Sequence, residues 1–386
     1  MNKAYVILNN LNHPMKFLII SHVEHKLIGN RISAYAPYVR EMNIWFNHVD
    51  EVTVVAPLGM EQISAIDLEY KHQNLSFNAI PSIQFTGFKH ALKSIIKIPR
   101  IFIVIFNACR KTDHIHLRCP GNIGLIGCLV QVFFPKKMKT AKYAGNWDPN
   151  ATQPLSYKFQ KWMLSNTFLT RNMTALVYGD WKNQTKNVKS FFTATYRDAD
   201  RQVPTLRSYT GALKFVYVGS LVEGKRPLLA IQIVSKLKNK GFDVMLDLFG
   251  DGVLKSNLQN YISKNNLNSF IKLQGNHEKE DVKAALKEAD FLILLSKSEG
   301  WPKAITEGMF FGVVPIATSV SCIPNMLGYG SRGIIVDPDI DNAVETIQGF
   351  LNNTKRLKLI SEEATKWSQS YTLDVFENEL IKLLKA

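Results

Sequence analysis

The chain has 386 residues, of which 46% are hydrophobic and 11% aromatic, and its formal net charge is +15. A chain of this length is too long for one ordinary core and predicts two domains of roughly 150 to 200 residues each. The apolar content excludes extensive disorder, and the positive charge indicates an anionic partner such as nucleic acid, an acidic lipid surface or a phosphorylated ligand.

The cysteines and the apolar runs predict a cytoplasmic location. Four cysteines are scattered without a C-x-x-C pair, and no apolar leader with a small-residue cleavage site opens the chain. The apolar run NIGLIGCLVQVFF (122–134) is shorter than the ~18 residues that a membrane-spanning helix needs. Residues 1–14 precede a second methionine and fit a strand, an extension from an upstream start or a disordered arm.

Apolar runs of strand length alternate with amphipathic segments through the first half of the chain, a pattern typical of parallel α/β sheets. Helices are expected between the strands, including 29–42 and 154–166. The strands themselves are expected at 16–21, 51–56, 113–118, 139–145 and 174–180.

The chain then turns polar and aperiodic over 185–213, which predicts an interdomain linker. A second series follows, with strands expected at 213–221, 242–252, 270–275, 289–298, 313–318 and 333–338. The predicted fold class is α/β, with two doubly wound Rossmann-like domains, 1–205 and 206–370, facing each other across a cleft. Residues 371–386 are expected to form an amphipathic helix that packs back on the first domain.

One segment of the first domain has an unusual charge pattern. FKHALKSIIKIPRIFIVIFNACRK (88–111) combines an apolar face with six cations. A basic helix lying on an anionic bilayer has this composition. A solvated basic face over an ordinary core helix accounts for it equally well. The six cations are Lys89, Lys93, Lys97, Arg100, Arg110 and Lys111.

The stretch SKSEGWPKAITEGMFFGVVPIAT carries two glutamates, Glu299 after an expected strand and Glu307 in the helix that follows. Pro302 suits the first helical position, and the free amides of the turn present a positive helix end to the cleft. A carboxylate within the helix can accept hydrogen bonds from a vicinal diol such as that of a ribose. This stretch therefore predicts a site for a nucleotide-linked ligand.

Two turns upstream add the cations and glycines that such a ligand needs. VYVGSLVEGKRP has Gly219 and Ser220 at a strand end, then Lys225 and Arg226 at a helix start. A small residue permits close approach of a ligand, and cations neutralise a diphosphate. LFGDG supplies Gly250 at a second strand-to-helix turn.

Together with LQGNHEKEDV and GIIVDP, these motifs resemble, in order, the nucleotide-sugar domain of glycosyltransferase family 4. The resemblance implies the GT-B fold and a retaining, metal-independent transfer. It implies that Glu307 binds the ribose hydroxyls, Glu299 the hydroxyls of the donor sugar, and Lys225 the leaving diphosphate. The backbone amides of Gly300 and Trp301 would orient the sugar and its phosphates.

The first domain resembles the family in fewer places. IHLRCPGNIG is similar to the family's strand-end histidine segment, which implies that His116 acts near the anomeric carbon or the acceptor. YAGNWDP ends another expected strand, where Asn146 and Trp147 are acceptor-side candidates, although Trp147 also suits the core. The family's glycine-rich loop is replaced by SHVEHKLIGN, in which His22 is a further acceptor-side candidate.

The sequence departs from the family pattern at two positions of the expected donor site, and it contains two short motifs that could suggest a metal site. The family's arginine after Gly219 is Ser220, which leaves Arg226 as a substitute, and Pro302 replaces the glycine three residues after the first glutamate. The D-x-D triplets lie in the linker and in a turn, and no histidines have metal-binding spacing. No metal and no cofactor are therefore expected beyond a nucleotide-sugar co-substrate, with UDP expected ahead of GDP.

The sequence predicts a glycosyltransferase that moves a sugar to a hydroxyl of a glycan or lipid-linked oligosaccharide in cell-surface polysaccharide synthesis, such as that of capsule or lipopolysaccharide. The basic surface predicts peripheral contact with the inner face of the plasma membrane. Basic residues that are spread along the chain without a recognised motif argue against nucleic acid. Two alternatives stay open: a sugar-nucleotide epimerase of the same architecture, and a catalytically inactive subunit, which Ser220 and Pro302 favour slightly.

Overall fold

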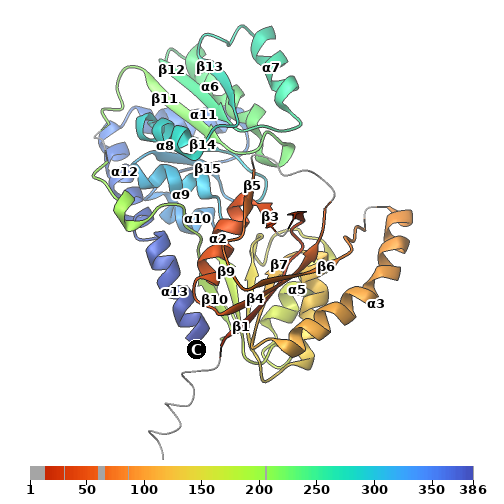
Figure 1. Ribbon diagram of the computed structural model, residues 1–386. Helices are drawn as coiled ribbons and strands as arrows, with labels where there is room; N and C mark the ends of the chain where they lie inside the picture. The colour runs from red at the N-terminus through yellow and green to blue at the C-terminus, as the bar shows by residue number, and fades with distance from the viewer. Residues whose placement is uncertain (1–13, 30, 60–65, 86, 205–206, 386) are drawn as a thin grey trace, which may run out of the picture.

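The computed structural model describes residues 14–29, 31–59, 66–85, 87–204 and 207–385. Two α/β units make up this part of the chain, one above the other in Figure 1, each built on a parallel sheet. The predicted α/β class with two parallel sheets is confirmed. The predicted boundary between 205 and 206, and residues 1–13, lie outside the described residues.

The first unit contains, in the described part of the chain, seven parallel strands in the order β10-β9-β8-β7-β1-β4-β6. Strand β1, with the sequence KFLII, is buried on both faces, as expected for a parallel strand covered by helices on either side. The strands are β1 (Lys16–Ile20), β4 (Glu51–Pro57), β6 (Leu75–Ile80), β7 (His114–Cys119), β8 (Met138–Tyr143), β9 (Met173–Tyr178) and β10 (Val188–Phe191).

Helices cover the two faces of this sheet with separate hydrophobic cores. One core packs α3 (Phe88–Lys111), α4 (Asn122–Val130) and α5 (Leu155–Ser165) against one face. The other core packs α2 (Ala36–Phe46) against the opposite face, together with the last helix of the chain. The carboxyl ends of the strands are therefore left free to meet the second unit.

The predicted helix over 29–42 is wrong in its first part. Residues Arg31–Tyr35 form strand β3, which pairs antiparallel with β2 (His25–Ile28) and β5 (Asp67–Glu69) in a small separate sheet. The helix starts at Ala36, where Pro37 occupies its first turn. Proline fits that turn because its missing N–H needs no partner there.

The second unit has six parallel strands among the described residues, in the order β13-β12-β11-β14-β15-β16. Each lies within one of the six segments predicted for this half. They are β11 (Leu213–Val218), β12 (Val244–Phe249), β13 (Ile271–Gly275), β14 (Phe291–Leu294), β15 (Val314–Thr318) and β16 (Ile334–Val336). The helices are α6 (Pro227–Asn239), α7 (Lys255–Lys264), α8 (Lys279–Glu288), α9 (Lys303–Phe310), α10 (Ile323–Met326), α11 (Ile340–Leu351) and α12 (Thr354–Ser368).

The predicted linker over 185–213 is shorter than expected, because its first part is strand β10 at the edge of the first sheet. VKSF is only four residues long and mostly exposed, so it shows no clear periodicity. Beyond it, Arg207 anchors the chain to the second unit: its buried guanidinium donates hydrogen bonds to the carbonyl oxygens of Ala289 and Phe311.

The chain returns to the first unit at its end. Helix α13 (Leu373–Lys385) runs down beside the first sheet in Figure 1. Phe376 and Leu380 are buried there in the same cluster as Phe17 and Trp45. The first unit therefore contains both early and late parts of the sequence.

Among the helices that the structure describes, none combines the length and the apolar character needed to cross a lipid bilayer.

We expect Leu380→Ala to lower the free energy of unfolding by about 2 to 5 kcal/mol, because it leaves a cavity at a fully buried leucine. Urea unfolding followed by circular dichroism measures the loss. The matched variant Leu359→Ala, at a leucine of α12 that is 56% exposed, should change the unfolding free energy by less than about 0.5 kcal/mol. Equal effects of the two substitutions would contradict the packing of α13.

Candidate active site

A cleft of about 720 Å³ lies where the carboxyl ends of the two sheets face each other. The first unit supplies the loops after β1, β7 and β8, and the second unit supplies the turn between β14 and α9. Side chains and backbone that line it include His22, Tyr38, Glu41, Arg118, Asn146, Tyr178, Ser298, Glu299, Gly300, Trp301 and Lys303.

The two walls of the cleft approach each other closely at Gly300. A Cβ on Gly300 would lie 2.4 Å from the carbonyl oxygen of Ala144, so no larger residue fits without moving the units apart. Next to this contact, Asn146 Nδ2 donates a 3.4 Å hydrogen bond to Ser298 Oγ. Gly300 therefore sets how closely the E-x7-E turn approaches the first unit.

Glu299 and Lys225 form an ion pair on the second-unit side of the cleft. The Glu299 side chain is buried and lines the cleft, while Lys225 is half-buried and donates to its Oε1. The pair holds the Lys225 ammonium beside the cleft, where an anionic ligand such as a diphosphate can compete with Glu299 for this cation.

Glu307 faces a second cavity, of about 560 Å³, which adjoins the cleft. Its Oε1 accepts a 2.6 Å hydrogen bond from Thr195 Oγ1 in the segment that follows β10. The two cavities share Glu41, Thr193 and Lys303 in their walls. The two glutamates of the motif thus serve adjoining spaces.

A buried carboxylate that the sequence prediction missed lies where these spaces meet. Glu41 of α2 is 3.3 Å from Arg118 Nη1 and 3.9 Å from Lys142 Nζ, and Thr193 Oγ1 donates to it at 3.4 Å. Burial opposes its charge, but Lys142, Arg118 and Lys303 outweigh burial and lower the pKa of Glu41 to about 2. Glu41 is therefore a fixed anion at neutral pH.

Lys142 of β8 is the most enclosed of these cations. Its side chain is 1% exposed, and its Nζ donates a 2.9 Å hydrogen bond to the carbonyl oxygen of Phe192. The ammonium also lies 4.9 Å from the ring centroid of Tyr178 and 4.7 Å from that of Phe191. Burial lowers the pKa of Lys142 to about 8, although Glu41 raises it.

The structure places His116 in the core of the first unit and outside the lining of the cleft, so its role near the acceptor stays a prediction. The ring is fully buried, stacks on Phe17, packs at a tilt against Trp45, and shares the hydroxyl of Thr140 with His114. Burial and the neighbouring His114 and Arg118 hold the pKa of His116 well below its usual range, so the ring is neutral. Arg118, two residues further along the same strand face, is the side chain that reaches the cleft.

Trp147 takes the core position that its sequence also suited, and Arg226 lies away from the cleft. Trp147 is buried, packs edge-on against Tyr143 and donates to Gln184 Oε1, so it closes the core. Arg226 donates to the carbonyl oxygen of Leu295 and lines a separate cavity beside α6 and α7.

The predicted glycine turns lie at the carboxyl ends of β11 and β12. A Cβ on Gly250, whose φ is +138°, would lie 2.0 Å from the carbonyl oxygen of Gly219. The carbonyl oxygen of Ser220 accepts a 2.9 Å hydrogen bond from the hydroxyl of Tyr217. These contacts give the two turns a structural role, and their contact with a ligand stays a prediction.

The remaining candidates lie in the cleft wall. His22, Asn146 and Trp301 all line it, and the Trp301 ring packs 5.7 Å from that of Tyr178 across the two units. Their contacts with substrate stay predictions. Within the described residues there is no group of three or more His, Cys, Asp and Glu side chains suited to a metal ion.

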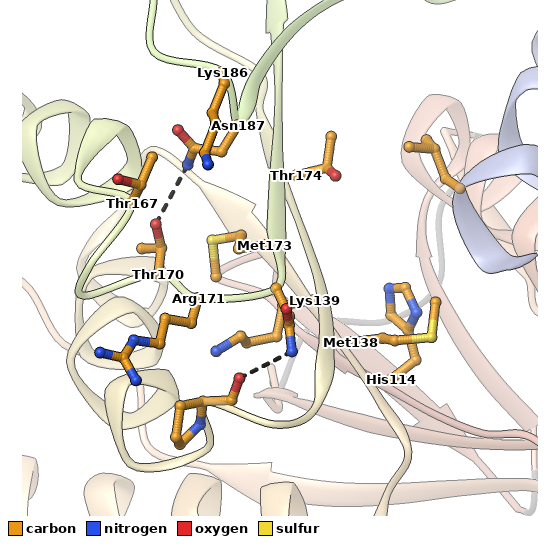
Figure 2. Close-up of a pocket in the computed structure, with 13 residues that line it drawn as sticks. His114, Met138, Lys139, Thr167, Thr170, Arg171, Met173, Thr174, Lys186 and Asn187 are labelled. Carbon is orange, nitrogen blue, oxygen red and sulfur yellow. Dashed lines mark hydrogen bonds between the residues drawn. The ribbon is translucent and has the colours of Figure 1, made fainter. Parts of the chain in front are cut away.

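A further cavity, of about 590 Å³, lies at the opposite edge of the first sheet, where β7, β8 and β9 begin (Figure 2). In this cavity the Asn187 amide donates a hydrogen bond to Thr170 Oγ1. The apolar side chain of Met173 and the cationic side chain of Lys139 line another part of its wall. Ligands of parallel α/β sheets bind at the carboxyl ends of strands, so this cavity lies outside the candidate site.

Residues 198–367 match the family model described as glycosyl transferases group 1. The second unit is a group 1 glycosyltransferase domain. The match to this domain covers β11 to α12, and therefore the Glu299–Lys225 pair and Glu307.

Curated relatives agree with the glycosyltransferase domain. The chain is 28% identical to an uncharacterized glycosyltransferase of Methanocaldococcus jannaschii, over 41% of this chain and 43% of that protein. It is 26% identical to the putative colanic acid biosynthesis glycosyltransferase WcaL of Escherichia coli, over 45% of each chain. The chain thus aligns with less than half the length of these relatives.

Solved structures confirm the fold across both units. The Anabaena protein HepE, solved in complex with UDP and glucose, superposes with a TM-score of 0.65 at 12% identity, covering 97% of this chain and 100% of that one. The glycosyltransferase domain and the more divergent first unit therefore share one GT-B architecture.

We expect Glu41→Gln to destabilise the protein by roughly 3 to 5 kcal/mol, because it leaves buried cations without their anion. The folded-state pKa of Glu41 is below its unfolded value, so its contribution is complete above about pH 4.5 and disappears as the pH falls to about 2. Thermal unfolding across pH 2 to 7 should therefore show a smaller acid loss in the variant. Glu345→Gln, at an exposed position of α11, should keep the wild-type profile.

Proposed function

We propose that the chain is a retaining glycosyltransferase of family 4 type, which moves a sugar from a nucleoside diphosphate to a hydroxyl of a glycan acceptor. The observation that carries the proposal is the Glu299–Lys225 pair at the carboxyl edge of a group 1 domain, facing a cleft between two units. A cation so placed stabilises the charge that develops on a leaving diphosphate.

The donor is proposed to span both cavities. Its ribose would hydrogen-bond to Glu307 in place of Thr195, with the nucleoside in the 560 Å³ cavity. Its diphosphate would lie between Lys225 and the amino end of α9, and its sugar would contact Glu299 in the cleft. HepE, which shares this fold, was solved with UDP and glucose, and we propose UDP ahead of GDP as the leaving nucleotide.

Leaving-group chemistry is proposed to depend on side-chain cations without a metal ion or other cofactor. Lys225, Lys303 and Arg118 approach the reaction space from both units. The carboxylate Glu41 is held in ion pairs with a pKa of about 2, so it is a weak base and no proton donor near neutral pH, which disfavours the epimerase alternative.

The acceptor is proposed to be a glycan or lipid-linked oligosaccharide of a cell-surface polysaccharide, bound against the first-unit wall near His22 and Asn146. WcaL, which carries a related domain, is named for colanic acid biosynthesis. Such acceptors are assembled at the cytoplasmic face of the membrane, so we propose that the protein works there as a peripheral protein.

Donor binding is tested by thermal unfolding with UDP, GDP, ADP and CMP. One nucleotide, expected to be UDP, should stabilise the native state by about 2.7 kcal/mol at ~100 times its dissociation constant. Glu307→Ala and Lys225→Ala should abolish the shift. Arg226→Ala, next to Lys225 but directed to another cavity, should retain it. A shift that survives both site substitutions would overturn the proposed donor site.

Transfer chemistry is tested without an acceptor, by the slow release of UDP and sugar from a panel of UDP-sugars. Proton NMR of an early time point should show the sugar with the anomeric configuration of the donor. Lys225→Ala should lower the rate about 100-fold or more, as loss of a transition-state charge partner does, and Arg226→Ala should not. If no UDP-sugar that binds is hydrolysed, the result would favour a catalytically inactive subunit. If the product is an epimerised sugar, the result would favour a sugar-nucleotide epimerase.

A further inference from the structure

The positive charge of the chain is concentrated in the first unit, contrary to the expectation that it is spread along the sequence. Residues 70–179 carry fifteen Lys and Arg and two acidic residues, Asp113 and Asp148. This segment includes α3, α4 and α5, which cover one face of the first sheet. Lys139 and Lys142 of this segment are buried, but Lys93, Arg100, Arg110 and Lys111 of α3 are exposed, so this helix gives the unit a cationic side.

Helix α3 exposes apolar side chains on that cationic side. Its inner face is buried at Ile101 and Ile105. Its outer face nevertheless carries large aliphatic side chains that are more than half exposed: Leu92 at 54%, Ile95 at 53%, Ile96 at 74% and Ile103 at 58%. Single exposed apolar residues are ordinary, but several along one helix mark an interaction surface.

Cations lie among these apolar side chains. Lys93 and Arg100 are exposed, and Lys97 donates to the carbonyl oxygen of Ser82 while remaining partly accessible. The sequence of α3 contains no Asp or Glu in its 24 residues. We call Leu92, Lys93, Ile95, Ile96, Arg100 and Ile103 the docking face.

The docking face begins at the cleft end of the first unit. Helix α3 follows β6, so it starts at the carboxyl edge of the sheet, and in Figure 1 its first turns extend beyond the sheet. Helix α5 starts at the same edge with Leu155, which is 83% exposed and follows the cleft-lining Pro154. Apolar side chains of α3 and α5 thus lie toward the edge of the sheet on which the cleft opens.

We propose that the docking face binds the surface of an anionic lipid bilayer, with the aliphatic side chains at the level of the acyl-chain boundary and the cations on lipid phosphates. Helices with apolar and Lys/Arg-rich faces bind membranes in this way. A second copy of the chain is a poor occupant, because it would bring two cationic faces together without acidic partners. The anionic bilayer fits both the apolar and the charged parts of the face.

The bilayer contact also orients the cleft. This step rests on the proposed function, in which the acceptor is a lipid-linked glycan. The first turns of α3 and α5 would then hold the opening of the cleft close to the membrane. The sugar end of the acceptor projects from that membrane. The membrane contact itself needs no substrate and is tested separately from catalysis.

Co-sedimentation of the purified full chain with vesicles tests the proposal. One vesicle set is phosphatidylcholine alone and the other contains 30% phosphatidylglycerol, each at low and at 0.5 M salt. Wild type should bind the anionic set at low salt, and binding should weaken in 0.5 M salt because exposed charges are screened. Equal binding to both vesicle sets, or to neither, would overturn the proposal.

Two variants test the two parts of the face. Ile96→Glu should abolish binding, whereas Leu359→Glu, at an exposed leucine of α12, should not alter it. The double variant Lys93→Gln, Arg100→Gln should bind about 30-fold more weakly, since each cation near such a surface contributes roughly 1 kcal/mol. Its control is Lys264→Gln with Lys355→Gln, both exposed in the second unit. Equal loss in variant and control would show a non-specific charge effect and overturn the proposal.

Two further measurements distinguish membrane docking from misfolding and from self-association. The nucleotide-induced shift of the unfolding midpoint should be unchanged in Ile96→Glu, so its loss of vesicle binding would not reflect misfolding. Sedimentation equilibrium of wild type should show a monomer. A dimer that Ile96→Glu dissociates would overturn the proposal in favour of self-association.

Discussion

The ion cluster around Glu41 ties together the parts of the molecule that form the cleft. The Glu41 carboxylate of α2 pairs with Arg118 of β7 and Lys142 of β8. The positive charge of Lys303, from the second unit, also stabilises the ionised form of this carboxylate. Without this anion, two cations would be enclosed in the first unit with no carboxylate in contact to offset the cost of removing them from water. The positions of Arg118 and Lys303, which line the cleft, therefore depend on the Glu41 carboxylate.

The parallel sheets could be predicted from the sequence, since strands covered on both faces appear as continuous apolar runs. The strands of the second unit all lie within predicted segments. The small sheet of β2, β3 and β5 was missed, because RISAY adjoins a true helix and its partners are three to four residues long. Strand β10 was missed for the same reason: four mostly exposed residues carry too little periodicity to show.

The site divides between local and long-range information. Glu299 and Lys225 lie in motifs with recognisable spacing, and the structure joins them. Glu41 and Lys142 had no such signal, because their pairing brings together positions about a hundred residues apart in the sequence. His116 was predicted from the resemblance of its segment, whereas Arg118, two residues along the same strand face, is the side chain that lines the cleft. Strand alternation shows which residues share a face but not how far along the strand burial extends.

Helix α13 makes the first unit depend on the end of the chain during synthesis. Phe376 and Leu380 complete the core around Phe17 and Trp45, and they leave the ribosome only after the entire second unit has been translated. Domains usually fold in the order in which they are made. Here the glycosyltransferase domain can finish first, while the amino-terminal unit keeps apolar surface uncovered until the last helix arrives.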